Sequence, residues 1–495
     1  MIRTKTADNG QRTTTRDADI TNPEKGGKFE PTTKAAAAVA ISALLAACGS
    51  GTEQAGNDPD KPYPDYTVTY LQGPPDQANM EAKPLAKDGN RFWMLPATPQ
   101  TTQWGVFDNG IEPVLRIDSG DTVAIETMSG GGGQVAPGIT EGQLEEINGA
   151  VPNRGPHTVT GPIYVNGAEP GDLLAIRINR IRLPNYATNN TGKGKGLFRD
   201  EFPDEVRSYY LDTDKMQLRF SPNVLVPLEP FPGVLGVGRS DTSDPSCTDG
   251  KCSTEQPGPY GGNMDLPVMQ VGSITYLSVQ VDGGLIWTGD SHAKQGNGEI
   301  DLDALETWFP ELNITVDLIK NQPQDWPTVE TPTSWVAVGY DRDLDKALDL
   351  SMSQTVALIS SKQGLSATDA QAMFDKTWDC RISQVVDEVL GTYCVVPKDT
   401  AAPRAADLPT ADTATAWVST GTAPKTLDAM KIAASAALDS MAANLGMTRN
   451  DAYHLATMVL DCRIDRFSRG DKTVACMVPK SIRVPARGER STNPP

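Results

Sequence analysis

Two stretches near the C-terminus repeat one another, and this duplication constrains the fold more than any other feature of the 495-residue sequence. Residues 335–398 and 417–480 are both 64 residues long and align at an offset of 82 positions. Each begins with Trp-Val-x-x-Gly, contains Asp-Cys-Arg-Ile and ends with Cys-x-Val-Pro-Lys. So many matched positions indicate an internal duplication, and we expect both copies to fold into the same supersecondary unit.

The first copy predicts a strand, two helices and a hairpin, in that order. Trp335–Gly339 is a short strand, and the apolar residues of Leu344–Leu358 then follow a helical period. Ser366 and Asp369 resemble a capping box, which would open a second helix that ends near Asp379. The second copy lacks the Gln-Val-Val segment of the first hairpin, so we expect its role to be structural.

The region 67–334 predicts short β-strands, because glycine and proline are frequent and apolar residues alternate with polar ones. Residues 113–118 and 121–127 alternate on both sides of a Ser-Gly turn and predict a hairpin. Another strand is expected over 174–178. The predicted fold is therefore mainly β, with a β-sandwich or jelly-roll-like core followed by an α+β C-terminal part.

The first 48 residues indicate an export signal. A polar leader precedes Lys34, an apolar run covers Ala35–Ala47, and Leu45-Ala-Ala leads directly into Cys48. This run of 13 residues is short for a membrane-spanning helix, which needs about 20, but it suits a signal-peptide core. The segment resembles a bacterial lipobox, so we predict a lipid on Cys48 that anchors the protein to a membrane of the cell envelope. The alternative is an Ala-rich helix with a buried cysteine.

The remaining cysteines agree with export, because an even number in an exported chain indicates disulfides. They are Cys247, Cys252, Cys380, Cys394, Cys462 and Cys476. In each repeat the two cysteines lie 14 positions apart on either side of a turn, and the first pair flanks a tight loop. Sequential pairing is therefore the preferred connectivity.

These features define the predicted domain organisation. It comprises a lipoprotein signal peptide (1–48), a flexible tether (49–66), a main domain (67–398) made of a β core (67–334) and the first α/β unit (335–398), a linker (399–416), the second α/β unit (417–480) and a disordered tail (481–495). The formal net charge of −19 argues against a nucleic-acid partner, because no basic stripe is present.

Acid–base side chains gather in two glycine-rich stretches. Only three histidines occur in the chain. His292 lies between Asp290 and Glu299, where three glycines let the backbone pass close to whatever these side chains hold. His157 opens a second stretch, which also contains Glu169.

Seven segments in order along the chain carry a resemblance to a known family. They are Leu95-Pro-Ala-Thr-Pro with Trp104-Gly-x-Phe-Asp, Val114-Leu-x-Ile-x-Ser-Gly-Asp-Thr-Val-x-Ile-Glu126-Thr, His157-x-x-Thr-Gly-Pro-x-Tyr-Val-x-Gly-Ala-Glu169-Pro-Gly-Asp172, Pro230-Phe-Pro-Gly-Val-x-Gly-Val, Gly261-Gly-Asn-Met-Asp265, Gly289-Asp-x-His-Ala-x-Gln-Gly-x-Gly-Glu299 and Asp379-x-Arg-Ile-Ser-Gln-Val-Val-Asp387. Residues 95–398 resemble the acetamidase/formamidase family of linear-amide hydrolases. The resemblance implies an amidase that cleaves the C–N bond of small linear amides, and we expect a homo-oligomer.

The sequence departs from the family pattern at Ser291, Lys294 and Asn297, where the family usually has Gly, a small residue and Asp. After Asp265 it also reads Leu-Pro-Val-Met, where an Arg-Asp pair is common in the family. Lys294 is expected to be a surface charge. These departures and the added repeat motivate an alternative function. In that alternative the chain is a non-catalytic envelope lipoprotein that uses the amidase scaffold to bind a ligand or partner.

Amide hydrolysis needs an activated nucleophile, oxyanion stabilisation and a proton for the leaving amine. Every mature cysteine has an expected disulfide partner and no Gly-x-Ser-x-Gly elbow occurs, so a mixed His/carboxylate cluster remains. We predict a divalent metal ion, zinc being the expected one, on His157, Asp290 and His292, with Glu169 and Glu299 as catalytic carboxylates.

Two of these residues also have a structural interpretation, since Asp290 could cap a turn and His157 could be a hydrogen-bonded core histidine. The third histidine, His454, is expected on the polar side of a helix in the second copy, with no functional role.

Overall fold

The computed structural model describes residues 90–150, 154–192, 194–399, 407–465 and 470–484, and the backbone of Lys83–Pro84. All of these residues belong to the second of two compact units, Thr67–Pro495. The predicted signal peptide, Cys48 and the predicted tether lie outside the described residues.

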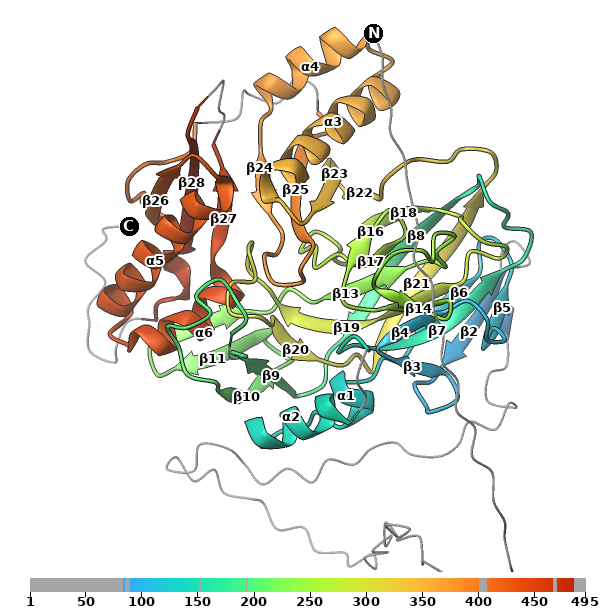
Figure 1. The fold of residues 1–495 in the computed structure, drawn as a ribbon, viewed down its shortest axis with the longest axis horizontal. Coiled ribbons are helices and arrows are strands. Elements are labelled where there is room, and N and C mark those ends of the chain that lie inside the picture. The colour runs from blue at the N-terminus through green and yellow to red at the C-terminus, as the bar shows by residue number, and fades with distance from the viewer. Residues whose placement is uncertain are drawn as a thin grey trace, which may run out of the picture. The chain divides into compact units, whose positions relative to one another are not determined.

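Most of the described chain forms two large mixed sheets (Figure 1). The larger sheet has the order β1 (Lys83–Pro84), β2 (Arg91–Leu95), β6 (Thr122–Ile125), β21 (Glu311–Ile319), β8 (Leu173–Arg182), β18 (Ile274–Ser278), β22 (Thr328–Glu330), β23 (Ser334–Asp341), β25 (Leu390–Pro397), β24 (Cys380–Ile382), β27 (Asp461–Ile464), β28 (Lys472–Pro479) and β26 (Ala416–Ala423). Neither of the two sheets closes into a barrel within the described part of the chain.

The second sheet carries most of the site described below. Its order is β12 (Val224–Pro227), β11 (Gln217–Ser221), β10 (Val206–Asp212), β9 (Tyr186–Asn190), β20 (Leu305–Thr307), β19 (Ile286–Lys294), β13 (Phe231–Gly236), β17 (Gly261–Asn263) and β16 (Pro257–Gly258), and β7 (Thr158–Val165) pairs with β19, β3 (Thr102–Trp104) and β5 (Leu115–Ile117). A small sheet consists of β14 (Cys247–Thr248), β15 (Lys251–Ser253) and β4 (Val106–Asp108).

The strands form where apolar residues alternate, as the sequence predicts. In β8, Leu174, Ile176 and Ile178 are fully buried. They join one hydrophobic core with side chains of the second sheet, such as Ile163 and Trp287. The prediction of a mostly β fold with helices in its C-terminal part is therefore confirmed.

The predicted hairpin over 113–127 is wrong, although both of its arms are strands. β5 pairs in parallel with β7, whereas β6 lies between β2 and β21 in the other sheet. Gly120 has a φ of +89° and its N–H donates to the carbonyl of Val316 at 2.7 Å. The Ser-Gly turn thus carries the chain from one sheet to the other instead of folding it back on itself.

Helices occur in two groups. Near the N-terminal side of the described chain lie α1 (Gly130–Gly133) and α2 (Glu141–Gly149), and the repeats contain α3 (Leu344–Gln363), α4 (Ala367–Lys376), α5 (Thr426–Leu445) and α6 (Arg449–Val459), with a short 3-10 helix at Lys480–Ile482. No helix in these ranges combines the length and apolarity needed to cross a membrane.

Both copies of the repeat show the predicted order of strand, two helices and hairpin. The first helix of each copy ends at a left-handed glycine, Gly364 or Gly446, and a hydroxyl at the N-cap begins the second helix. The copies meet where β24 pairs with β27, with Arg381 opposite Arg463. These two arginines are equivalent positions of the repeat, so the copies are related by a local two-fold axis and extend one continuous sheet (Figure 1).

The disulfide prediction is confirmed. The bonds Cys247–Cys252, Cys380–Cys394 and Cys462–Cys476 each join neighbouring strands. A cross-link of this kind stabilises the fold chiefly because it restricts the unfolded chain.

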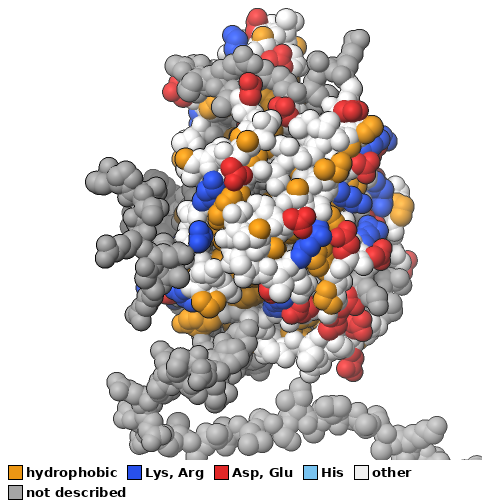
Figure 2. Space-filling model, turned by 90° about the vertical axis from the view of Figure 1, so that its left-hand side faces the viewer, with side chains coloured by type: hydrophobic (Ala, Val, Ile, Leu, Met, Phe, Trp, Pro, Cys, Tyr) orange, Lys and Arg blue, Asp and Glu red, His pale blue; other side chains and the backbone are white. Residues whose placement is uncertain are grey.

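The structure differs from the sequence prediction at one residue of the second copy and at the segment that follows it. His454 of α6 is fully buried, because α6 packs against the second sheet, and its Nδ1 bonds the side chain of Asn189 in β9. The first residues of the predicted tail are also part of the fold, since Arg483 bridges Val224 and the N–H of Val484 donates to Asn223. Figure 2 shows that basic and acidic side chains are interspersed on this side of the molecule.

Candidate active site

The site is built on β19, whose neighbours in the sheet determine which side chains surround it. Asp290 and His292 are two positions apart, so both point to the same face of the strand. Glu306 of β20 lies directly opposite His292 in the antiparallel register, and directly opposed side chains on one face are in contact distance. Asp265 follows β17, and Glu299 follows the turn that leaves β19.

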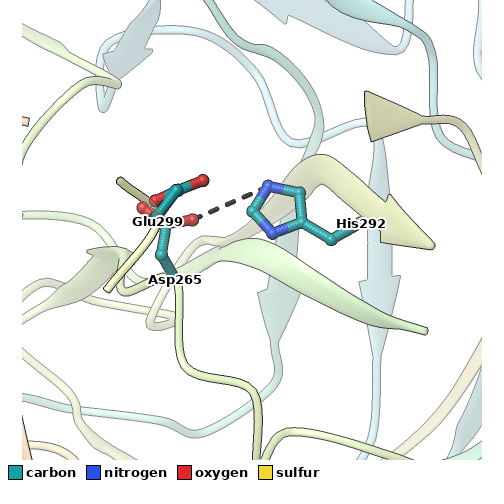
Figure 3. A group of neighbouring side chains, drawn as sticks. All are labelled: Asp265, His292 and Glu299. Carbon is teal, nitrogen blue, oxygen red and sulfur yellow. Dashed lines mark ion pairs between the residues drawn. The ribbon is translucent and has the colours of Figure 1, made fainter. Parts of the chain in front are cut away.

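The His292 ring is buried, and carboxylates face its Nε2 atom. Nε2 lies 3.1 Å from Asp290, 3.1 Å from Glu306 and 3.7 Å from Asp265. The carboxyl groups of Asp265 and Glu299 lie together, across from the edge of the ring (Figure 3). The structure therefore gathers negative charge around one nitrogen.

Gln295 fixes the orientation of this ring. Its amide nitrogen donates to the carbonyls of Asp265 and Ser383, each at 3.1 Å, so its oxygen faces His292. That oxygen lies 2.8 Å from Nδ1 of His292 and can only accept. The Nδ1 atom must then carry the proton, which leaves Nε2 available to the carboxylate cluster.

Six carboxylates and two histidines line one pocket of about 140 Å³. The carboxylates are Asp265, Asp290, Glu299, Asp303, Glu306 and Asp387. Apolar side chains such as Met128, Leu144 and Leu302 line it as well. The volume admits only a small molecule beside the charged groups.

Burial and mutual repulsion separate the pKa values of these carboxyl groups. Burial raises the pKa of Asp265 to about 6, and the charge of Asp290 adds to this rise. Burial and the charge of Asp265 raise the pKa values of Glu299 and Asp387 well above the usual range. Burial would also raise the pKa of Asp290, but the two histidines hold it well below its usual value. For His292, burial lowers the pKa, and Glu306 and Asp290 more than reverse this effect.

Three site carboxylates stand on strained backbone. Asp265, Asp290 and Glu299 have φ angles of +42°, +49° and +45°, in the left-handed region that non-glycine residues seldom adopt. Such conformations cost of order 1–3 kcal/mol each and concentrate at functional sites. The backbone conformations that direct these three side chains into the site therefore lower the stability of the fold.

The residues fit a divalent cation. One ligand atom each from Asp265, His292 and Glu299 lies within 4.8 Å of the others, and the same holds for Asp290, His292 and Glu306. Among the described residues, Asp265 Oδ1, Glu299 Oε2 and Asp387 Oδ2 are buried without a hydrogen-bond partner. Buried carboxylates need a counter-charge, and an imidazole with several carboxylate oxygens is a donor set that suits zinc and similar ions.

Gly233 of β13 leaves room at the centre of this cluster. A Cβ atom on Gly233 would lie 2.6 Å from Asp265 Oδ1 and 2.7 Å from His292 Cε1, and closer still to Asp290 Oδ2. Three groups of the site thus converge on a space that only glycine leaves open.

Four of the five residues predicted for the site line this one pocket: His157, Asp290, His292 and Glu299. His157 is placed less closely than the predicted ligand set requires. Its Nε2 lies 3.6 Å from Asp290 Oδ1 and its Nδ1 lies 3.1 Å from the carbonyl of Thr254. The groups close enough to share a metal ion with His292 are therefore carboxylates. His157 contacts this cluster through Asp290.

Glu169 was predicted as a catalytic carboxylate of this site, but the structure does not bring it to His292. Its side chain is 71% exposed and pairs with Lys320 at 3.0 Å. His157 and Glu169 flank opposite ends of β7, and eight residues of strand span about 23 Å. His292 itself lies within β19.

Sequence reasoning missed several residues of the pocket. Asp265 and Asp387 end segments that carry the family resemblance, so each was a visible signal. Glu306 and Asp303 lie in no such segment, and the pairing of β20 with β19 brings Glu306 to His292. Gln295 was visible three positions after His292, but its role depends on the carbonyls it bonds.

A sequence model of the Acetamidase/Formamidase family matches residues 97–256 and 246–335. The chain is 25% identical over 278 residues to the formamidase of Methylophilus methylotrophus, covering 44% of this chain and 67% of the relative. It is 26% identical over 230 residues to the acetamidase of Mycolicibacterium smegmatis, covering 36% and 57%. The matches thus span 57–67% of these relatives.

Solved structures match the same architecture. An acetamidase from Bacillus halodurans aligns with a TM-score of 0.55 at 25% identity, covering 61% of this chain and 97% of that chain. An acetamidase from Yersinia enterocolitica aligns with a TM-score of 0.56 at 28% identity, covering 64% and 95%.

Proposed function

The chain belongs to the acetamidase/formamidase family, and on this premise we propose that it hydrolyses the C–N bond of small linear amides to a carboxylate and ammonia. The observation that carries the proposal is the ring of carboxylates around Nε2 of His292 in a pocket of about 140 Å³. The pocket volume favours short amides such as formamide and acetamide.

In this proposal His292, Asp265 and Glu299 hold a divalent cation, with zinc as the ion that best suits the donor set. When bound, the cation would supply a hydroxide nucleophile near neutral pH and polarise the amide carbonyl. Gln295 keeps the His292 proton on Nδ1, so that Nε2 presents its lone pair to the cation. We thus propose Glu299 as a ligand of the cation, and not as the general base of the reaction.

The His157–Asp290 pair is placed to handle protons. The carbonyl of Thr254 can only accept, so Nδ1 of His157 carries a proton. Its Nε2 faces the Asp290 carboxylate at 3.6 Å and borders the pocket. This nitrogen can take a proton from the attacking water and return it to the leaving nitrogen, while Asp290 stabilises the imidazolium.

The departures from the family pattern at Ser291, Lys294 and Asn297 lie outside the pocket, which favours catalysis over the alternative of a non-catalytic scaffold. Ser291 bonds the hydroxyl of Thr127 at 2.7 Å, and Lys294 pairs with Glu229 instead of lying free on the surface. Asn297 bonds Asp461 and Tyr393. None of the three borders the space in which an amide would bind.

Removal of bound metal is the first test. Dialysis against a chelator is expected to abolish ammonia release from formamide and acetamide, and added Zn²⁺ should restore it. Because a ligand that binds only the folded state stabilises it, the Tm should fall and recover in parallel. Undiminished turnover by protein shown to be metal-free would contradict the proposed chemistry.

We also propose that the protein is anchored to the cell envelope through a lipid on Cys48, with its disulfides formed outside the cytoplasm. Cys48→Ser is expected to move the protein from the membrane to the soluble fraction, because acyl chains contribute about 0.8 kcal/mol per buried CH₂. Fractionation and gel mobility measure this. Unchanged partitioning would show that Cys48 carries no lipid. The expected homo-oligomer stays a prediction, which light scattering can test.

A further inference from the structure

The loop that carries three site residues is held by the second copy of the repeat. Residues 295–303 leave β19 and contain Gln295, Glu299 and Asp303. The N–H of Gly296 donates to the carbonyl of Thr457 at 2.7 Å, and the N–H of Cys462 donates to the carbonyl of Asn297 at 3.3 Å. A Cβ on Gly296 would lie 2.5 Å from the Leu460 carbonyl, so the two backbones are in direct contact.

Asn297 is the centre of this contact. Its amide nitrogen donates to Asp461 Oδ1 at 2.7 Å, and its oxygen accepts the hydroxyl of Tyr393 at 2.6 Å. Tyr393 belongs to the first copy and Asp461 to the second, so one side chain joins the loop to both copies. Arg463 bonds the other oxygen of Asp461 at 2.7 Å. Burial would raise the pKa of this half-buried carboxyl, but Arg463 holds it below its usual value.

The same unit contacts the rest of the loop up to Asp303. The hydroxyl of Tyr453 donates to the carbonyl of Ile300 at 2.8 Å. The hydroxyl of Thr457 donates to the carbonyl of Asp303, also at 2.8 Å. Glu299 lies between these anchors, and its left-handed backbone gives it no intrinsic preference for the conformation it adopts.

We infer that the second α/β unit, residues 417–480, is a positioning element of the site and that Asp461, acting through Asn297, sets where Glu299 and Gln295 lie. This inference rests on the proposed function. It gives the second copy a role beyond the merely structural one expected from its sequence. Asp461 touches neither the pocket nor the carboxylate cluster, so it is a positioning residue and not a catalytic one.

The pair Asn297–Asp461 allows a side-chain swap that tests the inference. Asn297→Asp would set two carboxylates at the distance of the present hydrogen bond, and their repulsion should displace the loop. In the double variant Asn297→Asp/Asp461→Asn, the amide at 461 donates to the carboxylate at 297 and still accepts from Arg463. Every hydrogen bond of the wild-type pair is then available again with the partners exchanged.

We expect Asn297→Asp to lower kcat/KM for acetamide on the order of 100-fold, since small misplacements of reacting groups have effects of this size. Zn²⁺ affinity measured by calorimetry should fall, and hydrogen exchange of the 295–303 peptide should accelerate. The double variant should recover most of all three quantities. Asp379 is the equivalent position of the first copy, and its side chain bonds Arg381 and Arg463. Asp379→Asn should therefore leave exchange of the 295–303 peptide unchanged.

Two outcomes would overturn the inference: wild-type exchange and Zn²⁺ affinity in Asn297→Asp, or a double variant no better than the single one. If Asn297→Asp fails to fold, recovery in the double variant decides the question alone. If no protein, wild type included, releases ammonia, the proposed function fails, while hydrogen exchange and metal affinity still report on the positioning role.

Discussion

Gly233→Ala is expected to abolish both metal binding and amide hydrolysis, although Gly233 has no side chain to act as a ligand. The added methyl group would lie 2.6 Å from Asp265 Oδ1 and 2.7 Å from His292 Cε1, far inside van der Waals contact. β13 cannot retreat to make room, since it is fully buried and paired with β19 and β17. The carboxylate and the ring must separate instead, and the ligand set loses its geometry.

The expected loss in kcat is on the order of 10⁴-fold, as when one member of a catalytic unit is removed. Zn²⁺ calorimetry and ammonia release measure the two effects, and circular dichroism checks the fold. Gly142→Ala is the matched control, because a Cβ on Gly142 meets nothing within 4 Å. A Gly233→Ala protein that binds Zn²⁺ with wild-type affinity would show that the ion does not lie where these three groups converge.

The parts of the molecule that could be predicted from the sequence are those that depend on local or repeated patterns. The repeat unit, its helix caps and its disulfides follow from spacing within 64 residues. The sharing of one face by Asp290 and His292 follows from the two-residue period of a strand. In each case, the determining interactions lie close in sequence.

The errors share a different cause, which is pairing between distant segments. The arms around Ser119–Gly120 alternate like a hairpin, but each finds a better partner in a different sheet. Glu169 lies near His157 in sequence, yet β7 separates them by its full length. His454 was assigned to a solvent-facing side because the sequence does not show that β9 packs against α6. All three depend on how segments distant in sequence pair or pack, which no local pattern encodes.

The same limitation explains why the carboxylates of the site were incompletely predicted. Glu306 reaches His292 through the register of β20 against β19, and Asp265 reaches it from the end of β17. The pKa of each carboxyl group depends on which other groups share its site, because burial raises the pKa of a carboxyl group that has no cationic partner. A sequence shows which carboxylates exist but not which of them must share one buried space.

Replacing His292 with alanine is expected to have an effect as large as that of Gly233→Ala. Bound Zn²⁺ should be lost and kcat should fall on the order of 10⁴-fold. His292 supplies the one nitrogen ligand that both carboxylate groups share, and no other described side chain reaches its position. Its removal also takes away the ring that lies between Asp290 and Glu306, so the mutual repulsion of these two carboxylates adds to the loss. Metal analysis and ammonia release measure the result.

Two further variants separate a shared site from a general loss of stability. His292→Ala combined with Glu299→Gln should lose little more activity than His292→Ala alone, because residues that act as one unit are not additive. Glu169→Gln should keep wild-type turnover, since the Glu169 side chain is exposed and pairs with Lys320 at the far end of β7. Additive losses in the double variant, or an inactive Glu169→Gln protein with an intact fold, would place the reaction elsewhere than at the carboxylate ring around His292.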